Sequence, residues 1–130
     1  MALRGDTFNR SAMTRTLISL PVVPPSVNRI WRHGSGRTYR IPAYAKWLNA
    51  MGLIAKGQMR GQPTWDAPVK VSILMRRPRK NSDLDNRIKP LLDLLQSAGV
   101  IANDKLVTGI QADWSDKVEA VEIAVSGAAA

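Results

Sequence analysis

The sequence predicts an α+β protein with a single mixed sheet and helices packed on it. Three observations support this fold class. A chain of 130 residues suffices for one modest hydrophobic core but not for two. Its composition, 45% hydrophobic and 22% charged, is typical of folded globular proteins. Segments with strand periodicity alternate with segments of helical periodicity, without an internal repeat, so we expect one sheet with helices on a face.

The strands are predicted from apolar residues that alternate with polar ones. The predicted strands cover residues 14–20, 69–75, 106–114 and 118–126, with a short extended piece at 38–40. We expect the last two strands to form a hairpin that turns at 115–117. Residues 32–37 contain two glycines and basic side chains and are predicted to be a loop.

Two helices are predicted from apolar residues at helical spacing. The first covers residues 42–58, with Pro42 in its first turn, where the missing N–H costs nothing. Its apolar stripe consists of Tyr44, Trp47, Leu48, Met51 and Ala55. The second follows Asp85 and ends at Gly99, with Pro90 in its first or second turn. Its apolar face consists of Ile88, Leu91, Leu92, Leu95 and Ala98. The folded domain is expected to cover 14–126, between a disordered tail at 1–13 and a disordered end at 127–130.

Several classes of site are excluded by composition. The chain has no Cys and one His, His33, so thiolate sites, disulfides and His-cluster metal sites are absent. No apolar run approaches the roughly 20 residues of a membrane span or forms a signal peptide. There is no glycine-rich phosphate-binding motif followed by Lys-Ser/Thr, so no nucleotide cofactor is expected. We therefore expect a cytoplasmic protein without a membrane partner.

The charge is unevenly distributed. The net charge of +9 and the pI near 10.7 favour a polyanionic partner, with nucleic acid first and an anionic membrane surface second. Residues 1–80 carry 15 Lys and Arg against two Asp, a net +13, and residues 81–130 carry four against eight carboxylates, a net −4. Acidic residues beside a basic run suggest a bound divalent cation, although a solvated acidic surface would give the same pattern.

The acidic residues with the most informative spacing lie between 83 and 104. Asp83 and Asp85 project to the same side of an extended segment, and Lys89 and Asp93 follow at helical intervals. Asp104 begins the next element, where the chain can return beside the helix. Carboxylates without competing His or Cys suit Mg²⁺ or Mn²⁺. The chemistry indicated is phosphodiester hydrolysis, with Lys89 stabilising charge on the phosphorane.

A purely structural interpretation fits the same spacing. In it, Asp83 and Asp85 cap a helix, Lys89 and Asp93 form an ion pair one turn apart, and Asp104 closes a turn. A pair of aspartates two residues apart is not specific by itself, so spacing alone leaves both interpretations open.

Two separated motifs resemble those of RusA-type Holliday junction resolvases. The letters DLDNRIKPLLDLL at 83–95 and GVIAND at 99–104 are similar to that family's D-x-D-N-x-x-K-x-x-x-D-x-L and G-V-I-x-x-D signature. The letters LPVVPPSVNRIW at 20–31 resemble its Pro-Pro-Ser-x-Asn-x-x-Trp motif. The resemblance covers residues 15–125, and two motifs in the right order are more specific than either one.

The resemblance implies a RusA-like fold and a Mg²⁺-dependent homodimeric endonuclease, with Mn²⁺ as a possible substitute. Such an enzyme nicks four-way junction DNA symmetrically in DNA recombination and repair and is encoded by bacteria or their prophages. By position, Asp83, Asp85 and Asp104 would bind the metal, and Lys89 would be the catalytic lysine. The supporting residues would be Asn86, which orients the site, and Asp93, which pairs with Lys89. Asn103 departs from the pattern, because an acidic residue often precedes the last aspartate, and this would weaken metal affinity.

The DNA-binding residues are predicted from the basic half of the chain. They are Arg29, Trp31, Arg32, Arg37, Arg76, Arg77, Arg79 and Lys80. Trp31 is the candidate for stacking on a base at the crossover, whereas the other tryptophans are expected in the core. Two symmetric nicks also require two copies of one site, which a two-fold dimer supplies. The alternatives are a basic nucleic-acid-binding protein without catalysis and a less selective branched-DNA nuclease.

Overall fold

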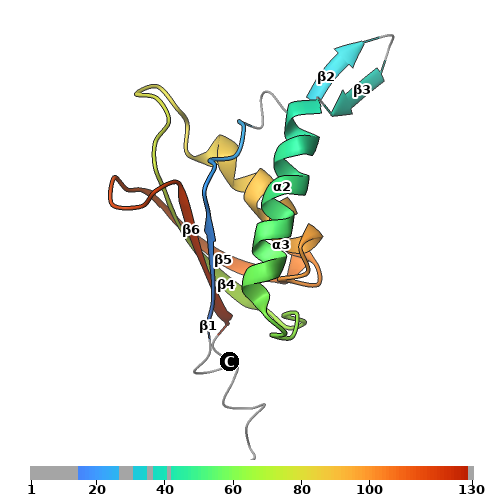
Figure 1. Cartoon of the computed structure of the whole chain (residues 1–130), viewed down its shortest axis with the longest axis vertical. Coiled ribbons are helices and arrows are strands. Elements are labelled where there is room, and N and C mark those ends of the chain that lie inside the picture. The colour runs from blue at the N-terminus through green and yellow to red at the C-terminus, as the bar shows by residue number, and fades with distance from the viewer. Residues whose placement is uncertain (1–14, 27–30, 35–36, 41, 129–130) are drawn as a thin grey trace, which may run out of the picture.

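The computed structural model describes residues 15–26, 31–34, 37–40 and 42–128 (Figure 1). The elements follow one another in the order β1, β2, β3, α2, β4, η2, α3, η3, β5, β6, where η marks a short 3₁₀ helix. The predicted disordered tail at 1–13 lies outside the described residues.

A four-stranded mixed sheet forms the centre of the molecule. Its strands are β1 (Arg15–Leu20), β4 (Val69–Met75), β5 (Val107–Trp114) and β6 (Val121–Gly127), arranged in the order β1-β6-β4-β5. β4 and β5 are parallel, whereas β6 is antiparallel to both β1 and β4. The predicted mixed sheet is therefore confirmed.

The predicted hairpin between the last two strands is wrong. β4 lies between β5 and β6, so these two strands are not hydrogen-bonded to each other. The reason is the helical connection from β4 to β5, which returns the chain to the end of the sheet where β4 began and makes the pair parallel. β6 then pairs with the other side of β4 instead of with its neighbour in sequence.

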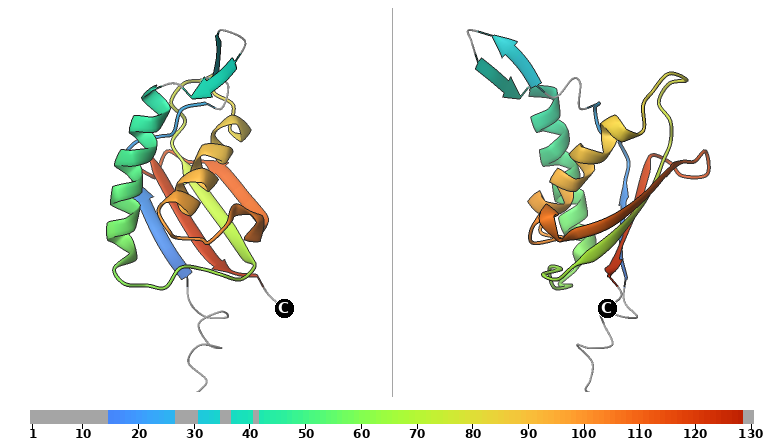
Figure 2. Two further views of the ribbon diagram at one scale, coloured as in Figure 1. Left: turned by 90° about the vertical axis from the view of Figure 1, so that its right-hand side faces the viewer. Right: turned by 180° about the vertical axis from the view of Figure 1, so that it is seen from behind.

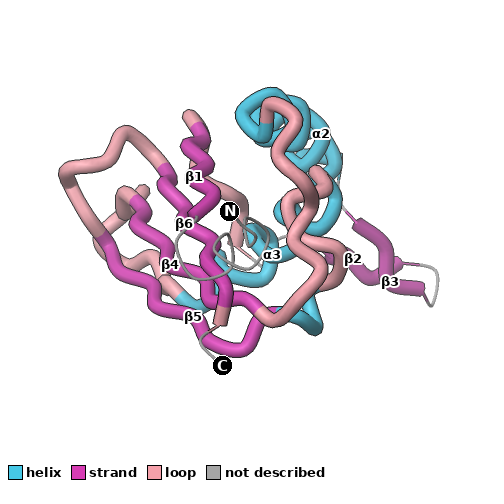
Figure 3. The backbone as a smooth tube through the Cα atoms, turned by 90° about the horizontal axis from the view of Figure 1, so that it is seen from below, coloured by secondary structure: helices cyan, strands magenta, loops and turns pink. Residues whose placement is uncertain are grey.

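In the described part of the chain, two α-helices cover one face of the sheet (Figure 2). They are α2 (Pro42–Met59) and α3 (Ile88–Ser97), and α3 lies between η2 (Asp85–Arg87) and η3 (Asp104–Leu106). Seen from below in Figure 3, the strands lie side by side, with the helices on one side of them. Pro90 is buried and is the third residue of α3, in the first turn as predicted. Gly99 has a φ of 77°, a backbone conformation that favours glycine and ends the helix.

A second, two-stranded sheet replaces the predicted loop at 32–37. β2 (Trp31–Gly34) pairs antiparallel with β3 (Arg37–Arg40), and the two project beyond the N-terminal end of α2 (Figure 1). The loop prediction is thus corrected for residues 32–34 and 37, while 35–36 lie outside the described residues. Residues on either side of the glycines are extended because they complete a backbone ladder, which glycine content alone does not reveal.

The core lies between the helices and the sheet. Residues of β1 and β4 alternate strictly between buried and exposed, with Ile18, Leu20, Val71 and Ile73 at 2% exposure or less. Each such aliphatic side chain contributes about 1.5–3 kcal/mol of burial free energy. This core fixes the positions of α2 and α3 relative to the ends of the strands.

The last strand ends the described fold close to the C-terminus. β6 covers Val121–Gly127, so the strand predicted at 118–126 begins three residues later and ends one residue later than expected, and the Ala128 N–H donates a hydrogen bond to the Pro68 carbonyl at 3.0 Å. Within the described part of the chain, no helix combines the length and the apolar character needed to cross a membrane.

Candidate functional site

The residues from Asp83 to Asp104, which we call the acidic motif, lie around α3 in the connection from β4 to β5. Asp85 is the first residue of η2, Lys89 is the second residue of α3, and Asp104 is the first residue of η3. η2 and η3 both contact α3. Residues that are 15 or more positions apart in the sequence therefore meet along this short helix.

Lys89 lies between two carboxylates. Its Nζ is 2.9 Å from Asp104 Oδ2 and 3.0 Å from Asp93 Oδ1. The hydrogen bond to Asp104, followed by the one to Asp93, raises the pKa of Lys89 above its usual range, so the side chain is an ammonium at neutral pH. Lys89 remains 54% exposed and can reach a molecule bound at the surface.

Asp93 is held from the opposite side by a residue of the core. The hydroxyl of Tyr44, on α2, donates a hydrogen bond to Asp93 Oδ2 at 2.8 Å, and Tyr44 is fully buried. The two oxygens of Asp93 thus join a rigid core side chain to Lys89. Sequence reasoning placed Tyr44 in the apolar stripe of the helix and missed this role, because the partner lies 49 residues away.

Two polar contacts fix the backbone beside Asp104. The Asp104 N–H donates to Gln96 Oε1 at 2.9 Å, and the Lys105 N–H donates to Asn103 Oδ1 at 2.8 Å. Asn103 is therefore the N-cap of η3, which uses its side-chain oxygen for the backbone. The departure from the acidic pattern at Asn103 leaves a residue that stabilises the turn carrying Asp104.

Asp83 and Asp85 do not cap the helices that follow them. The N-cap positions of η2 and α3 are Leu84 and Arg87, and neither makes a side-chain capping bond. Asp83 instead accepts a hydrogen bond from Asn86 Nδ2 at 3.2 Å, and Asp85 is exposed. The capping part of the structural interpretation is therefore wrong, whereas its ion pair between Lys89 and Asp93 is present.

Residues 24–26 of the N-terminal motif lie against the acidic motif. The guanidinium of Arg87 donates to the carbonyl of Pro24, and Pro24 is buried. A hollow of about 450 Å³ lies at this contact. It is lined by residues of the N-terminal motif, the basic run and the acidic motif: Pro25, Ser26, Pro78, Arg79, Asn81, Ser82, Asp83, Asn86 and Arg87. Motifs about 60 residues apart in the sequence thus form the walls of one hollow.

The same motifs place the chain among known proteins. The family described as Endodeoxyribonuclease RusA matches residues 21–126, which include the acidic motif, all but the first residue of the N-terminal motif and nearly all of the sheet after β1. The chain belongs to the RusA family. The predicted resemblance is therefore confirmed.

Individual RusA proteins are similar over most of their length. The crossover junction endodeoxyribonuclease RusA of Aquifex aeolicus (strain VF5) is 34% identical over 92 residues, which are 70% of this chain and 71% of that protein. The protein of the same name from Enterobacteria phage 82 is 37% identical over 91 residues, 69% of this chain and 74% of the relative. The one from Escherichia coli (strain K12) is 36% identical over 91 residues, with the same coverage.

The donor atoms of this RusA-family site suit a hard cation. Asp83 and Asp85 are exposed and Asp104 is 30% exposed, so carboxylate oxygens are accessible. Among the described residues, however, no three His, Cys, Asp or Glu side chains lie together as a ready-made metal site. The ammonium of Lys89 neutralises Asp104 instead. The chemistry of the residues fits Mg²⁺, and the assignment of Asp83, Asp85 and Asp104 as its ligands stays a prediction.

The basic run after β4 is partly engaged in structure. Arg76 donates to the carbonyls of Val118 and Asp116 at 3.0 and 2.7 Å, and the guanidinium of Arg77 lies 5.1 Å from the ring centre of Trp114. These two arginines hold the turn between β5 and β6. Two residues of the predicted DNA-binding run, Arg76 and Arg77, thus also stabilise the fold.

All four basic side chains of this run are exposed, and Arg79 and Lys80 are the two that lie nearest the acidic motif in the sequence. Arg79 also lines the hollow beside Asp83. The backbone of Arg79 and the side chain of Ser82 close the turn that presents them, since the Arg79 N–H donates to Ser82 Oγ at 3.2 Å. A phosphate near the acidic motif can therefore be contacted by Arg79.

The other predicted DNA-binding residues lie on the small sheet. Trp31 and Arg32 belong to β2 and Arg37 to β3, at the end of the molecule where α2 begins (Figure 1). Arg29 lies outside the described residues. Of the tryptophans expected in the core, Trp47 and Trp65 are buried and Trp114 packs against the core while partly exposed.

Proposed function

We propose that this chain is a Mg²⁺-dependent, structure-selective endonuclease that resolves Holliday junctions by paired symmetric nicks. The observation that carries the proposal is the meeting of the two family motifs at one hollow, through Arg87 and Pro24. The names of the relatives, crossover junction endodeoxyribonuclease, indicate the same substrate class. Membership of the RusA family supports nuclease chemistry at this site.

The proposed catalytic residues are Asp83, Asp85, Lys89 and Asp104, of which the three aspartates would hold Mg²⁺. When bound, the ion supplies Lewis-acid chemistry, which polarises the phosphoryl oxygen and lowers the pKa of a water molecule. Lys89 holds its proton firmly and donates hydrogen bonds to the extra negative charge that develops on the phosphoryl oxygens. Asn86 orients Asp83, and Asp93 orients Lys89.

The proposed substrate contacts combine phosphate binding with a two-fold assembly. Arg79 and Lys80 would bind phosphates beside the acidic motif, and the residues of the small sheet would reach the arms or the crossover. A four-way junction has two-fold symmetry, so a homodimer presents one site to each of the two opposed strands. Binding to the phosphates weakens steeply as salt is added, because each contact releases counterions.

Junction cleavage by the Asp85→Asn variant tests the proposed activity. We expect the wild type to cut a synthetic four-way junction in Mg²⁺ and the variant to lose about 100-fold or more in rate, because a ligand for the cation is removed. Binding of the junction, measured by gel mobility shift without Mg²⁺, should be retained. Asp66→Asn, an exposed aspartate outside the site, is the matched control and should cut normally.

Other outcomes of this assay would contradict the proposal. Binding of the junction without cleavage by the wild type would favour the noncatalytic nucleic-acid-binding protein. Equal cutting of linear duplex and junction DNA would favour the less selective nuclease. Wild-type rates for Asp85→Asn would refute the role of Asp85.

Thermal unfolding tests the proposed cation site without using activity. Ligand that binds the folded state stabilises it by RT ln(1 + [L]/Kd), which is about 1.4 kcal/mol at ten times Kd. We expect Mg²⁺ to raise the Tm of the wild type more than that of Asp83→Asn. Equal increases in both proteins would refute Asp83 as a ligand.

A further inference from the structure

The ion pair between Lys89 and Asp104 engages one of the three proposed cation ligands. Lys89 Nζ lies 2.9 Å from Asp104 Oδ2 and donates a hydrogen bond to it. Within the described part of the chain, Lys89 is the one side chain that bonds the carboxylate of Asp104. A positive charge at this distance repels a cation that approaches the same carboxylate. Cation binding at Asp104 is therefore favoured when this pair opens.

The second partner of Lys89, Asp93, is held in place by the core. Asp93 Oδ1 lies 3.0 Å from Lys89 Nζ, and Asp93 Oδ2 accepts a hydrogen bond of 2.8 Å from the hydroxyl of Tyr44. Tyr44 is fully buried on α2. Movement of Asp93 would break this bond to the core, so Asp93 keeps Lys89 at the site.

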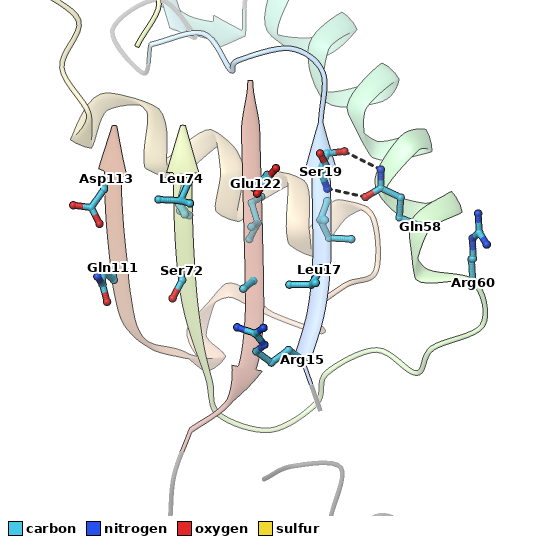
Figure 4. Close-up of a pocket in the computed structure, with 14 residues that line it drawn as sticks. Arg15, Leu17, Ser19, Gln58, Arg60, Ser72, Leu74, Gln111, Asp113 and Glu122 are labelled. Carbon is cyan, nitrogen blue, oxygen red and sulfur yellow. Dashed lines mark hydrogen bonds between the residues drawn. The ribbon is translucent and has the colours of Figure 1, made fainter. Parts of the chain in front are cut away.

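α2 is itself fixed to the edge of the sheet by polar contacts. The side-chain amide of Gln58 accepts a hydrogen bond from the Ser19 N–H and donates one to the Ser19 carbonyl, both at 2.8 Å (Figure 4). Nearer the start of the helix, Trp47 Nε1 donates to the carbonyl of Val22 at 3.0 Å. These contacts hold α2, and with it the hydroxyl of Tyr44, in a constant position relative to β1.

Asp104 is held through its backbone, so its side chain can turn without moving the chain. The Asp104 N–H donates to Gln96 Oε1 at 2.9 Å, and Asn103 caps the same turn. Rotation about the Cα–Cβ bond of Asp104 therefore takes the carboxylate away from Lys89. The pair lies at the surface, with Lys89 54% and Asp104 30% exposed. Because exposed ion pairs contribute little to the stability of a fold, this pair opens readily.

We propose that the Lys89–Asp104 ion pair couples the binding of the cation to the binding of a DNA phosphate. The proposal rests on the proposed function and adds how the two ligands of that site affect each other. When Asp104 turns to a bound cation, the ammonium of Lys89 is left free for a phosphate. When Lys89 binds a phosphate, the carboxylate of Asp104 is left free for a cation. Each ligand therefore raises the affinity for the other, and the effect is equal in both directions.

The charges around Lys89 favour this exchange. An ammonium has three N–H donors, of which Asp93 and Asp104 use two, so the third can contact a phosphate first. The phosphate and the Asp104 carboxylate are both anions and repel each other at this distance. Asp93 is bonded to the core, so Asp104 is the carboxylate that leaves. In the protein without DNA, Asp104 stays neutralised by Lys89.

Binding of Mg²⁺ to the protein without DNA tests the first half of the exchange. We expect Lys89→Met to lower the Kd for Mg²⁺ about threefold to fivefold in isothermal titration calorimetry, because Asp104 no longer has to leave an ion pair. Lys89→Arg keeps the charge and the pairing, so its Kd should not fall below that of the wild type. Lys105→Met is the matched control, since it removes the charge of the exposed residue next to Asp104, and it should change the Kd by less than about twofold.

Binding of a synthetic four-way junction without Mg²⁺ tests the second half. Asp104→Asn frees Lys89 for phosphate and should lower the Kd for the junction about threefold relative to Asp85→Asn. Both variants remove one carboxylate from the proposed cation site, so their difference reports on the pair with Lys89 and not on the total charge. Gel mobility shifts at one salt concentration measure both values, because phosphate contacts depend on salt. Far-ultraviolet circular dichroism should confirm that every variant is folded.

Nuclear magnetic resonance reports on the pair directly. The ¹H–¹³C signal of the Lys89 ε-methylene group is assigned by its loss in Lys89→Met. Titration of the wild type with Mg²⁺ should move this signal with the Kd that calorimetry gives, and by more than the corresponding signal of Lys105. A pair that only orients Lys89 would persist, and the Lys89 signal would then stay in place at saturating Mg²⁺.

Three results would overturn the coupling: equal Kd values for Mg²⁺ in the wild type and Lys89→Met, equal Kd values for the junction in Asp104→Asn and Asp85→Asn, or a Lys89 signal that Mg²⁺ does not move. Junction cleavage by the wild type, measured in parallel, separates the coupling from the proposed function. Cleavage together with equal Kd values refutes the coupling alone. A lower Kd in Lys89→Met without cleavage by the wild type refutes the function alone, and no Mg²⁺ binding by either protein refutes both.

Discussion

The hydrogen bond from Tyr44 to Asp93 offers a sharp test of how the core supports the candidate site. Tyr44→Phe removes the hydroxyl and keeps the ring that stacks on Trp47, whose centre is 6.3 Å away. A hydrogen bond to a charged group contributes about 1.5–3 kcal/mol. Asp93 is 26% exposed, so water can replace part of the lost bond. We therefore expect a loss of about 1–2 kcal/mol in the free energy of unfolding.

Urea unfolding followed by tryptophan fluorescence measures this loss, and a double-mutant cycle isolates the pair. Tyr44→Phe, Asp93→Ala and the double variant should show a coupling of about 1 kcal/mol, since each single change removes the same bond. Junction cleavage by Tyr44→Phe should fall several-fold, because Asp93 then holds Lys89 less firmly. Junction affinity without Mg²⁺ should not change.

Thr16→Val is the matched control. Thr16 is also buried, and its hydroxyl contacts Gln62 and Trp65, at the opposite end of β1 from Pro24. We expect a comparable loss of stability with no change in the rate of cleavage. A coupling below about 0.3 kcal/mol in the cycle, or an equal loss of cleavage in Thr16→Val, would refute the positioning role of Tyr44.

Two further changes test the supports around the site. Gly99→Ala should destabilise the protein by about 1–2 kcal/mol in urea unfolding, because φ is 77° at this position. Gly57→Ala, in the interior of α2 with nothing within 4 Å of the new Cβ, should stabilise the protein by about 0.5–1 kcal/mol. Destabilisation by both substitutions would contradict this reasoning. Arg87→Met removes the donor to the carbonyl of Pro24, so it should raise the Kd for the junction and speed amide hydrogen exchange at Ser26. Unchanged exchange would show that the segment at 21–26 is held by other contacts.

The local elements could be predicted because their signals are local. The alternation in β1 and β4 and the apolar stripe of α2 lie within single segments, and the structure confirms them. The face of α3 is confirmed in part: Leu91 and Leu95 are buried as predicted, but Leu94 is buried as well, and Ile88 and Leu92 are only partly buried. The order of the strands in the sheet could not be predicted from such local signals. Whether β5 pairs with β6 or with β4 depends on where α3 packs, and the sequence on either side of the 115–117 turn is compatible with both pairings.

The contacts of the site also separate into local ones, which could be predicted, and distant ones, which could not. The ion pair between Lys89 and Asp93 follows from helical spacing, and it is present. The contacts of Lys89 with Asp104 and of Tyr44 with Asp93 join residues 15 and 49 positions apart. Their distances depend on how α2 and α3 pack together, which no spacing along the chain reports.

The sequence by itself determined the fold class, the family, the acidic and basic halves of the chain and the types of residue at the site. These are properties of composition and of short motifs, which the sequence shows directly. Tertiary structure alone decided which arginines hold the turn between β5 and β6, which core residue supports Asp93, and which face of the sheet is left open. Those features arise because burial of the apolar core fixes the elements in space, and the polar side chains then bind whatever that packing brings within reach.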